Sequence, residues 1–390
     1  MNTRKSKKVK INLKRNQISK KILDKITKEK LSSRFDLIFK KISAEKNNKD
    51  SFFNILNANF NLNFNLKDLK RFQKFQKILV IGMGGSILGS EAIYDFLKNK
   101  IKKKVYFFND LDAKKVSNFE KQEDLRKTLI LVISKSGNTV ETLTNFLSLN
   151  ILKKKSKNII LVSERKDNIL FSISKKFDLF YIEHKSFIGG RFSVLSEVGI
   201  VPAFLMGLDI VKLRKNINKY FLNQNKKFLK ESCLIMAYLL IKKRYKNLIF
   251  LNYEPKLEKF LFWIQQLIAE SLGKNGKGFL PLVSNVPKDH HSLLQLYLDG
   301  PKDKLFWIFS SGNDDKKKIN TKKINDKIAF LHKKTFAKIK TSQKNSLIKI
   351  FQKKEIPFRE FTISKFDEET IGELFCYSIL ETIIVGKLAK

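Results

Sequence analysis

The chain has 390 residues, of which 43% are hydrophobic, and its 79 Lys and Arg against 37 Asp and Glu give a formal net charge of +42. This length favours about two globular domains, and no apolar run is long enough to cross a membrane. The basic start, Met1 to Arg15, lacks the apolar segment of a secretory signal, so we expect a cytoplasmic protein with no membrane partner.

The high positive charge alone would point to a nucleic acid or an anionic surface as the partner. However, the lysines are spread through every segment and form only short runs, such as those at 153–155 and 316–318. Phe, at 34 residues, is over-represented together with Lys, Asn and Ile, which indicates a compositional drift of the whole chain. We therefore expect no specific nucleic-acid partner, and a general attraction for small anionic substrates.

Residues 1–70 are predicted to form a basic helical segment, with helical patches at 18–30 and 35–42. Beyond it, short apolar runs alternate with helical patterns, which is typical of a doubly wound parallel sheet. The first such unit, residues 71–225, has predicted strands at 78–81, 105–108, 129–133, 159–162 and 179–182 and predicted helices at 87–97, 139–152 and 198–208.

The alternation restarts in a second unit, residues 226–365, with predicted strands at 247–251, 305–309 and 358–363, a helix at 257–272 and a helix between the last two strands. The final segment, residues 366–390, predicts a C-terminal helix that docks on the body, because its apolar positions run all along it. The fold class is therefore α/β, with two doubly wound parallel sheets, a helical N-terminal extension and a C-terminal helix.

A polar turn follows the predicted strand at 129–133 without a linker. Gly137 permits a tight turn, and Asn138 with Glu141 three residues later has the pattern of a capping box that begins a helix. Hydroxyls, a lysine and the free N–H groups of a helix N-terminus would then converge, which suits a phosphate monoester. The residues of this predicted anion site are Ser134, Lys135, Ser136 and Thr139.

A glycine turn, Gly82-Met-Gly84-Gly85-Ser86, follows the first predicted strand. It is not a dinucleotide fingerprint, because Ile87 stands where the third glycine is needed, and it lacks the Gly-Lys-Ser/Thr of a P-loop. Its backbone would let a ligand approach closely, although alone it is equally compatible with a simple tight turn. Both turns fall at the carboxyl ends of strands, where such sheets bind ligands.

Two further groups could act on a bound ligand. Arg191 follows two glycines, so its guanidinium could be held where negative charge develops, although a surface arginine is the plain alternative. Gln266 and Glu270 lie four residues apart on one face of a predicted helix. The apolar residues before Glu270 suggest partial burial, which raises the pKa of a carboxylate and suits a general base, although surface glutamates are the usual case.

The run Asp289-His290-His291-Ser292 holds two of the four histidines at a predicted loop-to-helix junction. No acidic, His or Cys ligands at metal-binding spacing accompany them, so we expect no metal, and proton transfer or a structural role are the alternatives. The remaining histidines, His184 and His332, are predicted to be structural. Cys233 and Cys376 are predicted to be reduced thiols.

In their order along the chain, these motifs resemble the glucose-6-phosphate isomerase family in its shorter bacterial form, from about residue 75 onward. The motifs are Gly84-Gly85-Ser86, Ser134-Lys-Ser-Gly-Asn-Thr139-x-Glu141-Thr142, Gly189-Gly190-Arg191-Phe-Ser193-x-x-Ser196, Gln266-x-x-x-Glu270-Ser271-x-Gly273-Lys274 and Asp289-x-His291-Ser292. The resemblance implies two sugar-isomerase (SIS) domains, in agreement with the two α/β units, and an aldose–ketose isomerisation of a hexose phosphate.

The resemblance also implies the role of each residue. Glu270 would move a proton between C1 and C2, Arg191 would stabilise a cis-enediolate, and His291 would help to open the ring. A proton shuttle of this kind needs no metal or organic cofactor. In the family the histidine comes from a partner subunit, which implies a homodimer with shared active sites. The implied substrate-binding residues are Ser134, Ser136 and Thr139 with the backbone around Lys135 for the phosphate, Gly84, Gly85 and Ser86 for the sugar, and Gln266.

The family continues past its last helix into an Asp-Gln-Pro-Gly-Val-Glu-like segment with an active-site lysine, whereas this sequence ends at Lys390. Either the sequence is a truncated form or the enzyme lacks that lysine, since neither Lys387 nor Lys390 lies in a matching context. Two alternatives in function stay open: a non-catalytic SIS-type sugar-phosphate sensor, and an isomerase that also accepts mannose 6-phosphate. A sensor would need the serine turn but not Arg191, Glu270 and His291.

Overall fold

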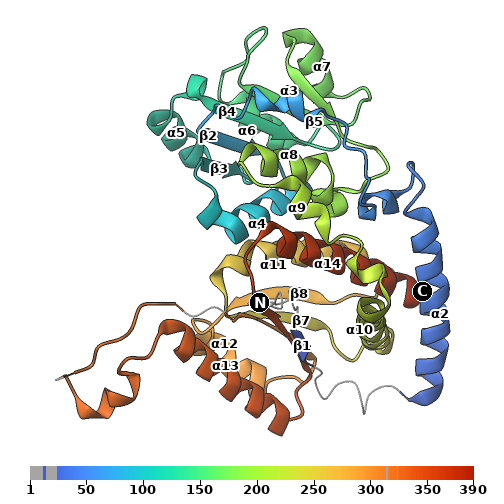
Figure 1. Ribbon diagram of the computed structural model, residues 1–390, viewed down its shortest axis with the longest axis vertical. Coiled ribbons are helices and arrows are strands. Elements are labelled where there is room, and N and C mark those ends of the chain that lie inside the picture. The colour runs from blue at the N-terminus through green and yellow to red at the C-terminus, as the bar shows by residue number, and fades with distance from the viewer. Residues whose placement is uncertain (1–11, 15–23, 313–314, 323) are drawn as a thin grey trace, which may run out of the picture.

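The computed structural model describes residues 12–14, 24–312, 315–322 and 324–390 and shows two α/β sheets separated by a layer of helices (Figure 1). The first sheet has the strand order β3-β2-β4-β5-β6, and all of its pairs are parallel. Its strands are β2 Lys77–Ile81, β3 Lys104–Phe108, β4 Thr128–Ile133, β5 Ile159–Ser163 and β6 Phe180–Glu183.

Helices cover both faces of this sheet, because its strands alternate two sets of apolar side chains. In β2, Ile78 and Val80 pack with α4, whereas Leu79 and Ile81 pack with the helices on the opposite face. The helices of the first unit are α4 Leu88–Leu97 and α8 Glu197–Leu205 on the first face, α5 Ala113–Gln122, α6 Val140–Leu147 and α7 Ile169–Phe177 on the second, with α3 Leu66–Lys70 and α9 Ile210–Lys215 beside them.

The second sheet has the order β1-β10-β9-β7-β8, in which only the edge strand β1 is antiparallel. In β7, Leu248 and Phe250 face the layer between the sheets, while Ile249 and Leu251 face α12 and α13. The strands are β1 Asn12–Lys14, β7 Asn247–Asn252, β8 Leu280–Asn285, β9 Lys304–Ser311 and β10 Phe358–Ile363, and the helices are α10 Asn223–Lys242, α11 Glu258–Leu272, α12 His290–Asp299, α13 Phe336–Lys353 and α14 Glu368–Leu388.

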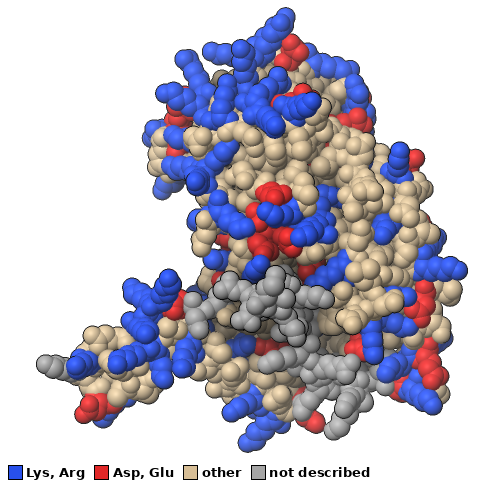
Figure 2. All heavy atoms as spheres, in the orientation of Figure 1, with Lys and Arg blue, Asp and Glu red and all other residues tan. Residues whose placement is uncertain are grey.

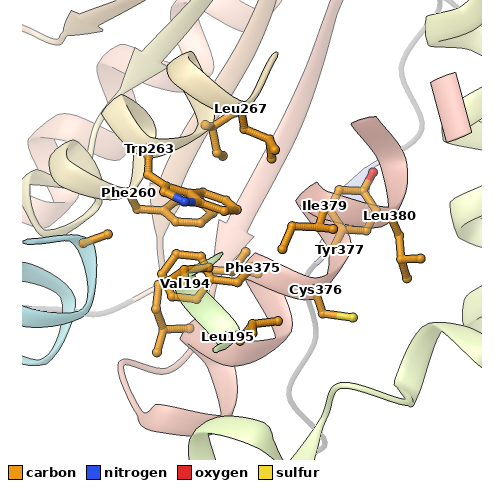
Figure 3. Packing of buried hydrophobic residues seen from close by; sticks show 14 of the residues in the cluster. Val194, Leu195, Phe260, Trp263, Leu267, Phe375, Cys376, Tyr377, Ile379 and Leu380 are labelled. Atoms are coloured by element: carbon orange, nitrogen blue, oxygen red, sulfur yellow. The ribbon is translucent and has the colours of Figure 1, made fainter. Parts of the chain in front are cut away.

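The layer between the sheets is one apolar core, to which both units contribute. Helix α11 packs on α4 of the first unit and on α14, and the 3₁₀ segment Gly190–Leu195 closes the same cluster. The Trp263 and Phe375 rings meet edge to face at 4.7 Å. Figure 3 shows the side chains of this contact pointing toward one another: Val194, Leu195, Phe260, Trp263, Leu267, Phe375 and Ile379.

All of the strands predicted from the sequence are confirmed, and so is the docking of the C-terminal helix, whose side chains are buried along most of its length. The edge strands β1 and β8 were not predicted. Strand β8 carries Pro281 and exposes Leu280 and Leu282, which an edge strand tolerates. Because these residues break the alternation of buried and exposed side chains, the sequence pattern did not predict this strand. The predicted helix 139–152 is too long, because α6 ends at Leu147.

The N-terminal extension is more regular than predicted. The patch at 35–42 belongs to a single helix, α2 Lys25–Glu45, which Asp24 caps by accepting a hydrogen bond from the Thr27 N–H. The earlier part of the patch at 18–30, up to residue 23, lies outside the described residues. The domain boundaries proposed after residues 70, 225 and 365 stay predictions.

No helix among the described residues is both long and apolar enough to span a bilayer. Cys233 and Cys376 are buried free thiols, as predicted.

Two glycines of α14 provide a test of how closely the C-terminal helix must approach the body. A Cβ at Gly372 would lie 1.7 Å from the Leu213 carbonyl oxygen, whereas a Cβ at Gly386 would meet only the Leu272 side chain at 3.3 Å. We expect Gly372→Ala to lower the free energy of unfolding by about 1–3 kcal/mol through overpacking. The matched Gly386→Ala should be neutral or stabilising by up to about 1 kcal/mol, because alanine favours a helix. Urea denaturation followed by circular dichroism measures both, and equal effects would contradict the packing.

Candidate functional site

The turn after β4 brings three hydroxyls together. The buried Ser134 Oγ lies 2.9 Å from Thr139 Oγ1 and 3.5 Å from Ser136 Oγ, and it accepts a hydrogen bond from the Gly137 N–H. Gly137 has φ +69°, and a Cβ there would lie 1.8 Å from Asn168 Oδ1, so only glycine fits. The convergence of hydroxyls at the N-terminus of α6, predicted from the sequence, is present.

The predicted capping box is wrong. Thr139, not Asn138, is the N-cap of α6, and its side chain makes no capping bond. The Asn138 Oδ1 instead accepts a hydrogen bond at 2.9 Å from the Ile169 N–H at the start of α7. This contact joins the serine turn to the next helix of the sheet, and it leaves the Thr139 hydroxyl directed at Ser134 rather than at its own helix.

The Lys135 side chain does not join the three hydroxyls. Its Nζ donates to the Ser186 carbonyl oxygen at 2.9 Å and lies 3.3 Å from Glu164 Oε1. The ammonium group therefore neutralises Glu164 next to the turn. Burial acts to raise the pKa of the Glu164 carboxyl, but the hydrogen bonds and charges of Lys166 and Lys135 outweigh it and lower that pKa. The binding of an anion by the backbone around Lys135 stays a prediction.

The glycine turn lies beside the serine turn, because β2 and β4 are neighbouring parallel strands paired from Lys77 to Ile81. It also touches the segment that carries Arg191. A Cβ at Gly85 would lie 2.3 Å from the Gly190 carbonyl oxygen, and the Ser193 Oγ donates to that oxygen and to the Gly85 carbonyl oxygen at 2.6 and 3.3 Å. The absence of a side chain at Gly85 is what lets the two backbones meet.

Arg191 and Glu270, one from each α/β unit, form an ion pair with 2.7 Å between Nη1 and Oε1. The Arg191 Nε donates to the Ser271 Oγ at 2.7 Å, so two adjacent residues of α11 fix the guanidinium. Half of the Glu270 side chain is exposed, against 18% of the Arg191 side chain. The Glu270 side chain is therefore about half buried in the single chain, where the sequence predicted partial burial.

Gln266 completes this group on the same face of α11. Its Nε2 donates to Glu270 Oε2 at 3.3 Å, and a Cβ at Gly84 would lie 2.9 Å from that nitrogen. The Gln266 Oε1 is buried and has no hydrogen-bond partner among the described residues, so it is available to a ligand donor. Sequence reasoning had found Gln266 and Glu270 but had assigned no role to Ser271, although it directly follows Glu270.

His291 lies apart from this group. It is exposed in the first turn of α12, which covers the opposite face of the second sheet from α11 (Figure 1). Its neighbour His290 is half-buried with Nε2 3.2 Å from the Tyr253 hydroxyl, and burial lowers the pKa of His290. The chain therefore brings Arg191, Gln266 and Glu270 together, next to the glycine and serine turns, without His291.

Two observations concern the acidic and the basic side chains of the described residues. Within the described ranges, no cluster of three or more His, Cys, Asp or Glu side chains could hold a metal ion. Lys and Arg side chains lie over both units on the face in Figure 2, rather than in one stripe. This distribution agrees with the interpretation of the charge as a property of the whole chain.

Comparison with protein families finds a match between residues 67–280 and the family model described as phosphoglucose isomerase. The probable glucose-6-phosphate isomerase of Methanococcus maripaludis is 35% identical over 364 residues, which cover 88% of this chain and 80% of that protein. The glucose-6-phosphate isomerase of Methanocaldococcus jannaschii is 32% identical over 340 residues, covering 83% and 82%.

Solved structures share the fold at lower identity. A hypothetical protein of Thermus thermophilus superposes with a TM-score of 0.77 at 22% identity, covering 93% of this chain and 91% of the other. A glucose-6-phosphate isomerase of Chlamydia trachomatis superposes with a TM-score of 0.68 at 19% identity, covering 83% and 67%.

The serine turn can be tested with inorganic phosphate. Thr139→Val keeps the shape of the side chain but removes a hydroxyl that lies within reach of Ser134 and Ser136. We expect the affinity for phosphate to fall by about 10- to 150-fold, since a hydrogen bond to a charged group contributes about 1.5–3 kcal/mol. Thr144→Val, an exposed position of α6, is the matched control. Isothermal titration calorimetry measures both, and an unchanged affinity in Thr139→Val would remove this hydroxyl from the anion site.

Proposed function

The chain belongs to the phosphoglucose isomerase family, and we propose that it interconverts glucose 6-phosphate and fructose 6-phosphate through a cis-enediolate, with Glu270 as the base. The observation that carries this assignment is the contact of Arg191 with Glu270 beside the glycine and serine turns. The reaction belongs to glycolysis and gluconeogenesis, and we place the enzyme in the cytoplasm, where those reactions run.

The two ends of the substrate meet groups from different units. The phosphate binds at Ser134, Ser136 and Thr139, whose hydroxyls and helix N-terminus suit a monoester. The sugar carbons then extend along Gly84–Ser86, where the bare backbone allows close approach. The buried Gln266 Oε1 accepts a hydrogen bond from a sugar hydroxyl, which supplies the partner that the free protein lacks.

Glu270 takes the proton from C2 of the open-chain aldose, the electrons of the C2–H bond form the C1=C2 double bond, and the C1=O π electrons move onto O1 to give the enediolate. The proton of the C2 hydroxyl passes to O1, C2=O forms, and C1 takes back the proton that Glu270 holds, which completes the ketose. Arg191 is already oriented by Ser271, so its guanidinium meets that negative charge without reorganising. Arg191 keeps part of its ion pair with Glu270 during this step, because the guanidinium has several N–H donors and can bind the carboxylate and the enediolate oxygens together.

Ring opening requires a group that donates a proton to the ring oxygen and accepts one from O1. We propose that the partner subunit's His291 is this group. An exposed His291 on a helix remote from Glu270 is suited to reach across to a second copy, and it is poorly placed for its own site. This proposal makes the enzyme a homodimer with shared active sites. It also supplies the cover over Glu270 that the single chain lacks.

Glu270→Gln tests the base. The variant keeps the shape and one hydrogen-bond acceptor but cannot take a proton, so kcat should fall by about 10²–10⁴-fold while fructose 6-phosphate still binds. A coupled assay with glucose-6-phosphate dehydrogenase measures kcat, and calorimetry measures binding. Asp36→Asn, which changes an exposed carboxylate of α2, is the control. A wild-type rate in Glu270→Gln would show that another group is the base.

Mixed dimers test the shared site. Glu270→Gln and His291→Asn homodimers should each be nearly inactive, but a heterodimer has one site with neither change. After subunits are mixed in equal amounts and exchanged, we expect the activity to return to about a quarter of the wild-type value, because half of the dimers are mixed and each has one intact site. No recovery, with exchange shown by mass spectrometry of differently tagged subunits, would place His291 in its own subunit's site. An active His291→Asn homodimer would instead remove His291 from catalysis.

A further inference from the structure

The guanidinium of Arg191 has a third partner besides Glu270 and Ser271. Its Cζ lies 4.5 Å from the centroid of the Phe192 ring, so an aromatic side chain lies against the group while its Nε and Nη1 are bonded to α11. The electron-rich face of an aromatic ring attracts a guanidinium, and the attraction is larger where water is excluded. Only 18% of the Arg191 side chain is exposed, so water has little access to this contact.

Phe192 is in turn held by the N-terminal extension. The centroid of the Phe52 ring lies 4.8 Å from that of Phe192, with an angle of 60° between the two ring planes. Phe52 begins the 3₁₀ segment Phe52–Leu56, and its ring meets the ring of the buried Phe53 with 5.2 Å between the centroids. A row of three aromatic rings therefore leads from the protein core to Arg191.

A buried arginine ties the extension to the stretch of chain that carries Arg191. Arg214, from α9, donates hydrogen bonds to three carbonyl oxygens. One of them belongs to Leu195, and the other two belong to the extension, to Ile55 at 3.1 Å and to Asn57 at 2.8 Å. Because the N–H donors of a guanidinium lie in one rigid plane, these bonds fix the distance between the two stretches of chain.

Two contacts complete this joint at the ends of the segment 189–197. The Glu197 Oε1 accepts a hydrogen bond from the Asn63 N–H at 2.9 Å. A Cβ at Gly189 would lie 3.3 Å from the Phe192 Cδ2, so the bare backbone of Gly189 lies against the same ring. The N-terminal extension therefore contacts this segment along its length, although the sequence predicted only helical structure there.

We propose that Phe192 and Phe52 form an aromatic brace that positions Arg191 for the reaction. Phe192 lies against the guanidinium, and Phe52 holds Phe192 in place from the N-terminal extension. Both are positioning residues, because each acts through Arg191. The inference rests on the proposed function, in which Arg191 meets the negative charge of the enediolate.

The brace matters most at the step in which the enediolate forms. Glu270 becomes neutral as it takes the proton, so its ion pair with Arg191 weakens at that step. The attraction of the Phe192 ring does not depend on the charge of Glu270, and the Ser271 hydroxyl also stays bonded. The guanidinium is therefore kept where the new negative charge appears. Loss of the brace should lower kcat more than it alters KM.

Fluorinated phenylalanines in place of Phe192 test the brace with little change in shape. Each fluorine withdraws electron density from the face of the ring, so mono-, di- and trifluorinated rings weaken the cation–π contact in steps. We expect kcat to fall at each step, by about 2- to 30-fold in all, with little change in the KM for fructose 6-phosphate. The same series at Phe351 is the control, because its buried ring meets Phe306 at 4.7 Å and no cation–π contact in the described part of the chain includes it.

A second set of variants tests the link to the N-terminal extension. Phe52→Leu removes the ring but keeps an apolar side chain, so kcat should fall by about 2- to 10-fold at an unchanged KM. Phe52→Tyr, which keeps the ring, should keep the wild-type kcat. When Phe192 is trifluorinated, Phe52→Leu should lower kcat less than it does alone, because both changes act on one contact. Leu37→Ala, at an exposed position of α2 in the same extension, should leave kcat unaltered.

Nuclear magnetic resonance reports the contact without activity. In protein labelled with ¹⁵N-arginine, the Nε–H signal of Arg191 is the one that is lost in Arg191→Lys. The ring current of Phe192 should shift this proton signal, and Phe192→Leu should remove the shift.

Three outcomes would overturn the inference: a kcat that does not change with the number of fluorines at Phe192, an equal fall in the Phe351 series, or an Arg191 signal that Phe192→Leu does not move. A wild type without isomerase turnover would refute the proposed function instead, while the Arg191 signal would still decide whether the brace exists.

Discussion

The contact of α11 with α4 is the constraint on which the site depends, because it fixes one α/β unit against the other. The hydroxyls proposed to bind the phosphate come from the first unit and the proposed base comes from the second, so the proposed catalysis requires a constant distance between them. The apolar layer of α4, α11 and α14 provides that constancy through close packing, and it places the Arg191 segment by burying Val194 and Leu195 in the same cluster. Arg191 can then pair with Glu270 across the junction.

Contacts close in sequence were predictable, and contacts between distant segments were not. The three hydroxyls of the serine turn lie within six consecutive positions, so the strand, the glycine and the helix start were sufficient to bring them together. The strands and the C-terminal helix were predicted for the same reason, since their patterns are local. The edge strand β8 was missed because Pro281 and two exposed leucines obscure its alternation.

The errors at the site have tertiary causes. Asn138 has the pattern of a helix cap, but the Ile169 N–H of a later helix takes its side chain. Lys135 lies in the turn that the sequence predicts to bind an anion, but its ammonium group pairs with Glu164, which directly follows the next strand of the sheet. The exposure of Glu270 and its link to Arg191 through Ser271 depend on how two units meet, which no spacing along the chain records.

The second unit carries a similar polar turn whose two serine hydroxyls are already engaged by charged side chains. Its strand β9 ends in Ser310-Ser311-Gly312, much as β4 leads into a serine- and glycine-containing turn. There, however, the Ser311 hydroxyl donates to the Glu254 carboxylate, and the Ser310 hydroxyl accepts from Lys344, which also pairs with Glu360. The Glu254 carboxylate therefore takes the Ser311 hydroxyl as a donor, and its negative charge would repel a phosphate. In the first unit the Glu164 carboxylate pairs with Lys135 and Lys166 instead of accepting from the serine-turn hydroxyls. The two sheets therefore share a fold, while the proposed function assigns the phosphate to the first unit and the base to the second.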